Sequence, residues 1–267
     1  MKALVYTCVL DAYDRVFPPL EPEPGLDYLI VTDDPGLSVD GWRTLTIDAK
    51  RFTSVQQANR YYKMLMHREL PGYACSLYID GNIRLLGRTS EVLEGLVASG
   101  AALGVFAHPL RSRVADEIKA CVQQGKTRPG DKTGAEMDYY RQHGFTDDAG
   151  LVEAGILLKN HLHPGLDRAM RLWWALYRRF GSRDQISLPY VLWRTSLPVM
   201  IQSYSFRQSN AWFGLYAHRK DPRASRHYAY VQARAYDSMG YRALLSAWHA
   251  SWRLRRALRR LRRESRV

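Results

Sequence analysis

The chain has 267 residues, 46% of them apolar, and a formal net charge of +13. This length and composition allow one large domain with a full hydrophobic core and argue against a chain that is disordered through most of its length. Residues 241–267 hold nine arginines and one glutamate, which leaves a net charge of only +5 on the first 240 residues. The excess charge is therefore mostly a property of the C-terminal segment, and it does not mark the whole chain as a nucleic-acid-binding protein.

The predicted elements alternate between apolar runs and helical patterns. We predict strands at 3–10, 26–32, 43–48, 74–80, 101–107 and 151–160. Helices are predicted at 54–69, 89–98, twice within 113–142 with a basic linker between them, at 165–180, and from about Asp184. Alternating strands and helices favour an α/β sheet with functional loops at the strand ends. We assign residues 1–236 to this domain and 237–267 to a basic amphipathic helix.

The N-terminus and the cysteines indicate the compartment. The segment MKALVYTCVLDAYD has no small-residue cleavage site and its apolar run stops at Asp11, so we expect a first strand and not a signal peptide. No run of about eighteen uncharged apolar residues occurs, so no transmembrane helix is expected. Cys8, Cys75 and Cys121 show neither a disulfide framework nor metal-ligand spacing. Buried structural thiols in a cytoplasmic protein are the expected state.

The segment IDGN, residues 79–82, carries the most specific chemical signal. In an extended chain the side chains of Asp80 and Asn82 point the same way and could bind one metal ion, and Gly81 would let a diphosphate approach the backbone. Hard divalent cations prefer such oxygen ligands and usually arrive with substrate phosphates. The same residues could instead form a β-hairpin turn, because Ile83 and Leu85 continue the apolar alternation.

Two groups of charged residues could accompany a metal site. Arg60, Lys63 and His67 share one face of the helix before IDGN, where they could bind a diphosphate or form an ordinary solvated face. Acidic residues also follow several predicted strands, where they could line a ligand crevice or serve as caps and turn formers: Asp11, Asp14, Asp33, Asp34 and Asp80.

The segment SRDQISLPY starts another helix. Asp184 could be its N-cap, or Asp184 and Gln185 could contact a sugar. Aromatic and histidine residues give weaker signals and are more often structural: His108 with Arg111, Trp173 with Trp174, and His218. The chain lacks a nucleophile elbow, a P-loop and a dinucleotide-binding glycine fingerprint, which disfavours acyl hydrolysis, P-loop ATPase chemistry and nicotinamide binding.

These segments occur in a recognisable order: YTCVLDAYD, YLIVTDD, ANRYYKMLMHRELPGYACSLYIDGNIRL, FAHPLR, GLVEAGILLKNH, and WW followed by SRDQISLPY. Over residues 3–220 the series resembles the glycosyltransferase family that was once a domain of unknown function and is typified by plant mucilage proteins. The resemblance implies a GT-A-like fold, similar to that of glycogenin-like transferases, in which a Rossmann-like mixed sheet is flanked by helices. It also implies a nucleotide-sugar donor, with a UDP sugar as the first expectation.

The resemblance further implies roles for individual residues. Near the nucleoside it places Tyr6, Thr7, Tyr13 and Asp33, and near the diphosphate Arg60 and Lys63. Asp80 and Asn82 would bind Mn²⁺ or Mg²⁺, and His218 would complete the metal shell. The catalytic candidates are Asp184, Gln185 and Glu153. The acceptor or sugar candidates are His108, Arg111, Trp173 and Trp174.

Two residues depart from the family pattern. Asn82 replaces an acid in the metal motif, so the ion gains one fewer negative charge, and we expect its binding to be weaker or more dependent on substrate. Asp11 stands where we expect a small residue, which leaves the shape of the first loop open.

The C-terminal segment forms a predicted amphipathic helix over 241–263. Alanines, leucines, Trp248 and Trp252 recur at helical spacing and arginines fill the other positions. This pattern favours an anionic membrane surface. A helix packed on the domain is nearly as consistent with it, and RNA binding is a third possibility.

The sequence therefore predicts a metal-dependent glycosyltransferase that acts on a glycan or lipid-linked acceptor in cell-envelope polysaccharide synthesis. We expect it in the cytoplasm, peripheral at the inner face of the membrane, with no specific nucleic-acid partner. The alternatives are a metal-dependent hydrolase of nucleotide-sugars or other polyphosphates, and a non-catalytic protein that binds membranes or nucleic acid.

Overall fold

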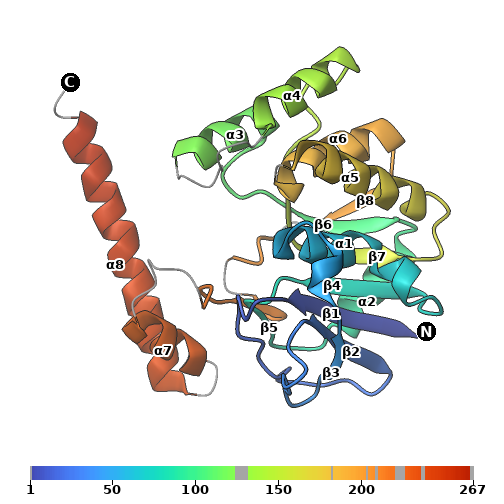
Figure 1. The fold of residues 1–267 in the computed structure, drawn as a ribbon. Helices are drawn as coiled ribbons and strands as arrows, with labels where there is room; N and C mark the ends of the chain where they lie inside the picture. Colours follow the sequence, from blue (N-terminus) through green and yellow to red (C-terminus); the bar gives the residue numbers. More distant parts are fainter. Residues whose placement is uncertain are drawn as a thin grey trace. The chain divides into compact units, whose positions relative to one another are not determined.

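The computed structural model describes residues 2–123, 132–181, 183–202, 204–207, 210–219, 226–235 and 238–264 (Figure 1). The chain forms two compact units, Met1–Ala12 with Val16–Leu215, and Tyr13–Arg15 with Tyr216–Val267. The predicted domain of residues 1–236 thus runs past the end of the first unit. The basic linker predicted within 113–142 lies in residues 124–131, outside the described residues.

The first unit is built on a seven-stranded mixed sheet. Its strand order is β3-β2-β1-β4-β7-β6-β8. All neighbouring strands are parallel except β7, which is antiparallel to both β4 and β6. The predicted Rossmann-like mixed sheet is confirmed. The strand bounds are β1 Ala3–Val9, β2 Leu26–Thr32, β3 Arg43–Thr46, β4 Cys75–Ile79, β6 Leu103–Ala107, β7 Val152–Asn160 and β8 Val199–Gln202.

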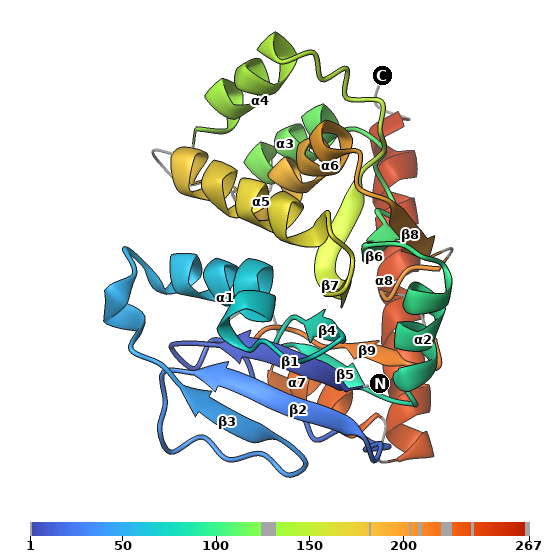
Figure 2. The ribbon, with the colours of Figure 1, turned by 90° about the vertical axis from the view of Figure 1, so that its right-hand side faces the viewer.

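Helices cover both faces of this sheet. Every residue of β1 is buried, as expected for a strand with packed layers on either side. Leu4 and Tyr6 belong to one hydrophobic cluster with residues of α1, α5 and α6, and Val5 belongs to a second cluster with residues of α2. Figure 2 shows α1 lying over β1 and β2. The helix bounds in this unit are η1 Ala49–Arg51, α1 Val55–Glu69, α2 Ser90–Ala98, α3 Val114–Gln123, α4 Thr133–Gln142, α5 Leu166–Phe180 and α6 Asp184–Thr195.

Helix α1 begins with the predicted cap. The Ser54 hydroxyl accepts a hydrogen bond from the Gln57 backbone N–H at 3.1 Å. The Gln57 side chain accepts one from the Thr53 N–H at 3.0 Å, one residue earlier than a standard capping box would place it. The helix ends at Glu69, just before Pro71. Local chemistry thus sets where this helix starts and stops.

The sequence did not predict three short strands. Strand β8 is one, and the others are β5 (Ile83–Leu85) and β9 (Phe213–Leu215), which pair with each other in a separate two-stranded sheet. Runs of three or four residues are too short to show a hydrophobic period. Because β4 pairs with β1 and β7, the hairpin interpretation of IDGN is wrong. The Ile83 N–H still donates to the Asp80 carbonyl at 2.9 Å, which closes a turn.

The second unit contains α7 (Arg226–Arg234) and α8 (Met239–Glu264). The Tyr228 hydroxyl lies 2.8 Å from Nε2 of His249, and the Tyr228 ring contacts the edge of Trp248. The predicted C-terminal helix is therefore present, and its first half packs against α7. The side chains of Trp252 and of the arginines after Arg255 lie outside the described ones. None of the described helices has the length and apolarity that crossing a membrane requires.

Candidate active site

The carboxyl ends of β1, β2 and β4 meet at one edge of the sheet, because the three strands are parallel. Asp33 follows β2, and both of its carboxylate oxygens accept from the Asp11 N–H, at 2.9 and 3.1 Å. Asp11 and Ala12 have left-handed φ angles of 53° and 44°. The first loop, whose shape the sequence left open at Asp11, is thus turned sharply and anchored to Asp33.

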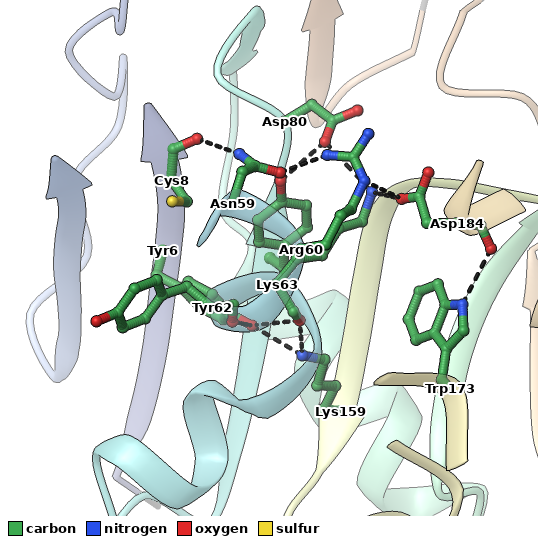
Figure 3. A network of polar contacts seen from close by, with 11 residues as sticks. Tyr6, Cys8, Asn59, Arg60, Tyr62, Lys63, Asp80, Lys159, Trp173 and Asp184 are labelled. Atoms are coloured by element: carbon green, nitrogen blue, oxygen red, sulfur yellow. Dashed lines mark hydrogen bonds and ion pairs between the residues drawn. The ribbon is translucent and has the colours of Figure 1, made fainter. Parts of the chain in front are cut away.

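Two cations on α1 bind one buried carboxylate. Nζ of Lys63 donates to Oδ2 of Asp184 at 2.6 Å, and Nε of Arg60 lies 3.1 Å from the same oxygen (Figure 3). The side chains of Lys63 and Asp184 are 2% and 6% exposed, and that of Arg60 is 28% exposed. The alternative of a solvated basic face is therefore wrong for Lys63. We name Arg60, Lys63, Asp80 and Asp184 the charge cluster.

His67 does not join the charge cluster. Its Nε2 lies 3.1 Å from Oδ1 of Asp167 at the start of α5. Burial lowers the pKa of His67 to about 4, with the Lys159 charge acting in the same direction and Asp167 opposing it. His67 therefore joins α1 to α5 as a neutral imidazole.

Asp184 is the first residue of α6 and not its N-cap. The N-cap is Arg183, whose side chain makes no capping hydrogen bond. Burial alone would raise the pKa of the Asp184 carboxyl, but the positive charges of Arg60 and Lys63 outweigh burial and hold it well below its usual range. The carboxylate is therefore ionised at neutral pH and fixed between two cations.

Trp173 fixes the turn that carries Asp184. Its indole N–H donates to the Asp184 carbonyl at 3.0 Å and to Oγ of Ser187 at 3.1 Å. The ring is fully buried, so it has no exposed face for the sugar contact predicted from sequence. Trp174 is partly buried and stacks on Tyr177 at 6.0 Å.

Asp80 directly follows β4 and lies beside the Lys63 ammonium. Its Oδ1 accepts from the Tyr78 hydroxyl at 2.9 Å and from Nζ of Lys63 at 3.5 Å, and its side chain is 34% exposed. Asn82 is buried within the turn, so the two residues do not share the extended backbone that the sequence argument assumed. His218 belongs to the second unit, where its Nδ1 lies 2.8 Å from Oδ1 of Asp14.

The metal site predicted at Asp80 and Asn82 would have few protein ligands. Among the described residues, no group of three or more His, Cys, Asp or Glu side chains is gathered as a metal site would require. Asp80 and Asn82 would provide one carboxylate and one amide. This set suits an ion that takes its other ligands from phosphate oxygens and water, which is the usual mode for Mg²⁺.

The predicted nucleoside contacts lie at different depths. Tyr6 and Thr7 are fully buried in β1, and the Thr7 hydroxyl has no hydrogen-bond partner among the described residues. Tyr13 is half exposed in the second unit, with its ring 5.2 Å from the His218 ring. The Tyr6 hydroxyl contacts backbone carbonyls of α1, so Tyr6 supports the helix that carries Arg60 and Lys63.

Two further candidates carry unsatisfied polar atoms. Glu153 on β7 is buried, and one of its oxygens binds Arg207 while Oε2 has no partner among the described residues. Burial raises the pKa of the Glu153 carboxyl, and Arg207 opposes this effect. Nε2 of Gln185 is also buried without a described partner. These atoms are suited to hydrogen bonds with a ligand.

His108 and Arg111 form a separate contact with α3. Nε of Arg111 donates to Oε2 of Glu117 at 2.5 Å, and the Arg111 side chain also lies 3.0 Å from Nε2 of His108. Nδ1 of His108 accepts from the Arg111 N–H at 3.0 Å. The polar groups of both residues are thus engaged at the start of α3.

Sequence reasoning missed four residues of this region. Asn59 donates to the Cys8 carbonyl at 2.7 Å and accepts from Arg60, which ties α1 to the end of β1. Tyr78 contacts Asp80, Arg207 contacts Glu153, and Lys159 contacts the backbone of α1. Lys159 had a visible signal, since it is a lone charge in the apolar run GILLKN. All three cysteines are buried free thiols, as predicted.

Comparison with known proteins decides the family. The family model of the TOD1/MUCI70 glycosyltransferase-like domain matches residues 29–218, well over half of the chain. The chain belongs to this family. The match includes α1, the IDGN turn and the first turn of α6. The resemblance to plant mucilage glycosyltransferases is therefore confirmed.

Two individual proteins are similar to this member of the TOD1/MUCI70 family. The probable hexosyltransferase MUCI70 of Arabidopsis thaliana is 26% identical over 159 residues, which cover 56% of this chain and 27% of that protein. The chain thus spans about a quarter of this curated relative. The apo crystal structure of mouse xyloside xylosyltransferase 1 matches with a TM-score of 0.45 and 12% identity, over 76% of this chain and 85% of that one.

Proposed function

We propose that this chain transfers a sugar, of the hexosyl type, from a nucleoside-diphosphate donor to a hydroxyl group of an acceptor. The observation that carries the proposal is the charge cluster of Arg60, Lys63, Asp80 and Asp184 at the carboxyl edge of the sheet. It occurs in a member of a glycosyltransferase-like family. A UDP sugar is the donor that we test first.

The charges of the cluster support a role for a divalent metal ion. Two cations and two carboxylates cancel, so the cluster by itself offers no net positive charge to a diphosphate. A divalent ion at Asp80 and Asn82 would supply that charge and neutralise the negative charge that develops on the leaving diphosphate. Arg60 is the cluster cation with the more exposed side chain, so it is the one that contacts phosphate oxygens.

The other residues orient the reacting groups. Trp173 and the two cations hold Asp184 in one position, which pre-organises that side of the site. The buried Oε2 of Glu153 accepts a hydrogen bond from a sugar or acceptor hydroxyl, and Nε2 of Gln185 donates one. His108 and Arg111 stand at the start of α3 as further acceptor candidates.

Nucleotide binding tests this function directly. Thermal unfolding is measured with UDP, GDP and CDP, each with and without Mn²⁺, for the wild type, Asp80→Asn and the control Asp138→Asn. Asp138 is an exposed carboxylate of α4 that pairs with Arg141 on the same helix, so its substitution leaves the site intact. We expect one nucleotide to raise the Tm of the wild type and the control only with Mn²⁺, and to have no effect on Asp80→Asn.

Two results would count against the transferase. If no nucleotide stabilises the wild type, the donor site is absent, and a chain that still binds nucleic acid or vesicles would then be a binding protein. If the enzyme releases free sugar from a sugar nucleotide at full rate without any acceptor, it is a hydrolase. Dependence of product formation on an added glycan or lipid-linked acceptor supports the transferase.

We also propose that α8 binds an anionic membrane surface and brings the enzyme to an envelope acceptor at the inner face of the cytoplasmic membrane. Support comes from the nine arginines of residues 241–267 and from the exposed Leu254. Co-sedimentation with phosphatidylserine vesicles should fall sharply for Arg255→Glu with Arg259→Glu. The control, Arg43→Glu with Arg141→Glu, changes two exposed arginines of the first unit and should sediment like the wild type. Equal loss in both variants contradicts this proposal.

A further inference from the structure

Lys159 is a fully buried cation that the proposed chemistry does not use. It lies on β7, and its ammonium donates to the hydroxyl of Tyr6 on β1 at 2.8 Å (Figure 3). It also donates to two carbonyls of α1, that of Lys63 and, at 3.5 Å, that of Met64. A lysine ammonium has three N–H donors, so these three acceptors use all of them.

Tyr6 binds the same part of α1. Its hydroxyl donates to the Lys63 carbonyl at 3.0 Å and to the Tyr62 carbonyl at 3.3 Å. These carbonyls lie inside the helix, where helix formation alone already gives them a partner. The extra hydrogen bonds therefore do not complete the helix. They fix its rotation and position relative to β1 and β7.

The residue that is held this way is the one that bridges the two acids. The Lys63 carbonyl is bound by Tyr6 and Lys159, while the Lys63 ammonium reaches Asp184 at 2.6 Å and Asp80 at 3.5 Å. A small rotation of α1 would move the ammonium away from both carboxylates. The backbone contact and the ion pairs thus act on opposite ends of one residue.

Stability alone does not explain a lysine at this position. Burial lowers the pKa of Lys159 well below its usual range, and the nearby Lys63 charge lowers it further, so the charged form is disfavoured there. The two preceding residues of β7, Leu157 and Leu158, are buried without such a cost. A buried ionic group can often be replaced by an apolar one without loss of stability.

We propose that Lys159 and Tyr6 are positioning residues, which hold α1 at the Lys63 peptide so that the Lys63 ammonium stays between Asp184 and Asp80. Neither residue is assigned contact with the donor or the acceptor. The positioning itself does not depend on the reaction, whereas its effect on turnover rests on the proposed function.

Chemical protection of Lys63 tests the positioning without any enzyme assay. The protein is treated with an N-hydroxysuccinimide acetyl ester, and acetylation of each lysine is followed by mass spectrometry. In the wild type, Lys63 is protected by its burial, whereas Lys119 is exposed and reports the intrinsic reactivity in the same sample. We expect Lys159→Met and Tyr6→Phe to speed the acetylation of Lys63 about tenfold or more, with Lys119 unchanged.

Ser76→Ala is the matched control. Ser76 is the cross-strand partner of Lys159 on β4, is equally buried, and binds His161 at 2.8 Å and not α1. All variants are compared at the same interval below their own Tm, so that global unfolding does not enter. Lys63 should stay protected in Ser76→Ala. Protection of Lys63 in both Lys159→Met and Tyr6→Phe would overturn the proposal. If Lys159→Met does not fold, Tyr6→Phe decides by the same measurement.

Turnover gives a second readout. Lys159→Met should lower sugar transfer by about tenfold to a hundredfold, as expected for a displaced site group. In a Lys63→Met background it should cause no further loss, because the ammonium that it positions is already gone. An equal loss in both backgrounds would refute a role that acts through Lys63. A wild type that transfers no sugar would refute the proposed function and leave the acetylation result intact.

Discussion

Replacing Asp184 by Asn removes the negative charge from between two cations. The carboxylate lies 2.6 Å from Nζ of Lys63 and 3.1 Å from Nε of Arg60, and the side chains of Asp184 and Lys63 are nearly inaccessible to water. Removing one partner of such a buried pair typically destabilises a protein by about 3–5 kcal/mol. Lys63 keeps Asp80 at 3.5 Å, and Arg60 can turn to solvent, so we expect the low end, about 3 kcal/mol.

Urea unfolding at neutral pH measures this loss, with Asp138→Asn as the control. Asp138 is an exposed carboxylate that pairs with the exposed Arg141 one turn along α4, so its loss should change the free energy of unfolding by about 0.5 kcal/mol or less. The m value should be the same for all three proteins if only stability changes. For a chain of this size, the loss at Asp184 corresponds to a decrease in Tm of roughly 6–12 °C.

The pH dependence gives the decisive check. The pKa of Asp184 is held below its ordinary value in the folded state, so its stabilisation is complete above the unfolded pKa, about 3.9, and is lost as the pH falls toward the folded pKa. The difference in stability between the wild type and Asp184→Asn should therefore narrow below about pH 4. A difference that stays constant down to about pH 3, or an Asn variant as stable as the control, would refute the ion-pair account.

Three other positions give further predictions. Gly155→Ala should destabilise by about 1–3 kcal/mol in chemical denaturation, because its Cβ would lie 2.9 Å from Cζ of Phe206 and 3.2 Å from Oδ2 of Asp80. The control Gly95→Ala lies in α2 with open space around it and should be neutral or stabilising; equal loss in both contradicts the steric account. Burial raises the pKa of Glu136 to about 8, so the wild type should lose stability relative to Glu136→Gln, by up to about 4 kcal/mol, as the pH rises from about 4.5 to 8. A pH-independent difference in urea titrations would show that Glu136 ionises normally. Trp173→Phe should cost about 1–2 kcal/mol and lower sugar transfer, because the Asp184 carbonyl and Ser187 lose their indole donor; full activity would remove Trp173 from the support of the site.

Local sequence patterns were enough for the main elements of the fold. The strands that begin at Ala3 and Leu26 and the helix that starts after Ser54 were predicted within a residue or two. Their signals are short-range, since a buried strand needs a continuous apolar run and a helix start needs a capping side chain. The short strands β5, β8 and β9 were missed because their pairing partners, and not their own residues, make them strands.

The candidate site, like the fold, was predictable from sequence only in part. Arg60, Lys63, Asp80 and Asp184 were all candidates from sequence. Their residue types alone left a turn, a cap and a solvated face open as alternatives, and the resemblance to a glycosyltransferase family favoured a ligand site. Their mutual geometry was not predictable, since Lys63 and Asp184 are 121 positions apart in the chain. Trp173 was a candidate from sequence only for contact with a sugar, and the lone charge of Lys159 was visible but had no assigned role. Their contacts with the Asp184 carbonyl and with α1 depend on packing between distant segments.

The sequence by itself determined the family, the α/β class, the position of IDGN after a buried strand, and the two cations on the preceding helix. Only the tertiary structure decided that Lys63 is buried between two acids, that IDGN is a turn without a hairpin, and that Lys159 contacts the backbone of α1. The physical reason is the distance along the chain over which each kind of interaction acts. Capping and periodicity act over a few residues, whereas ion pairing and burial depend on which distant segments the packed core brings together.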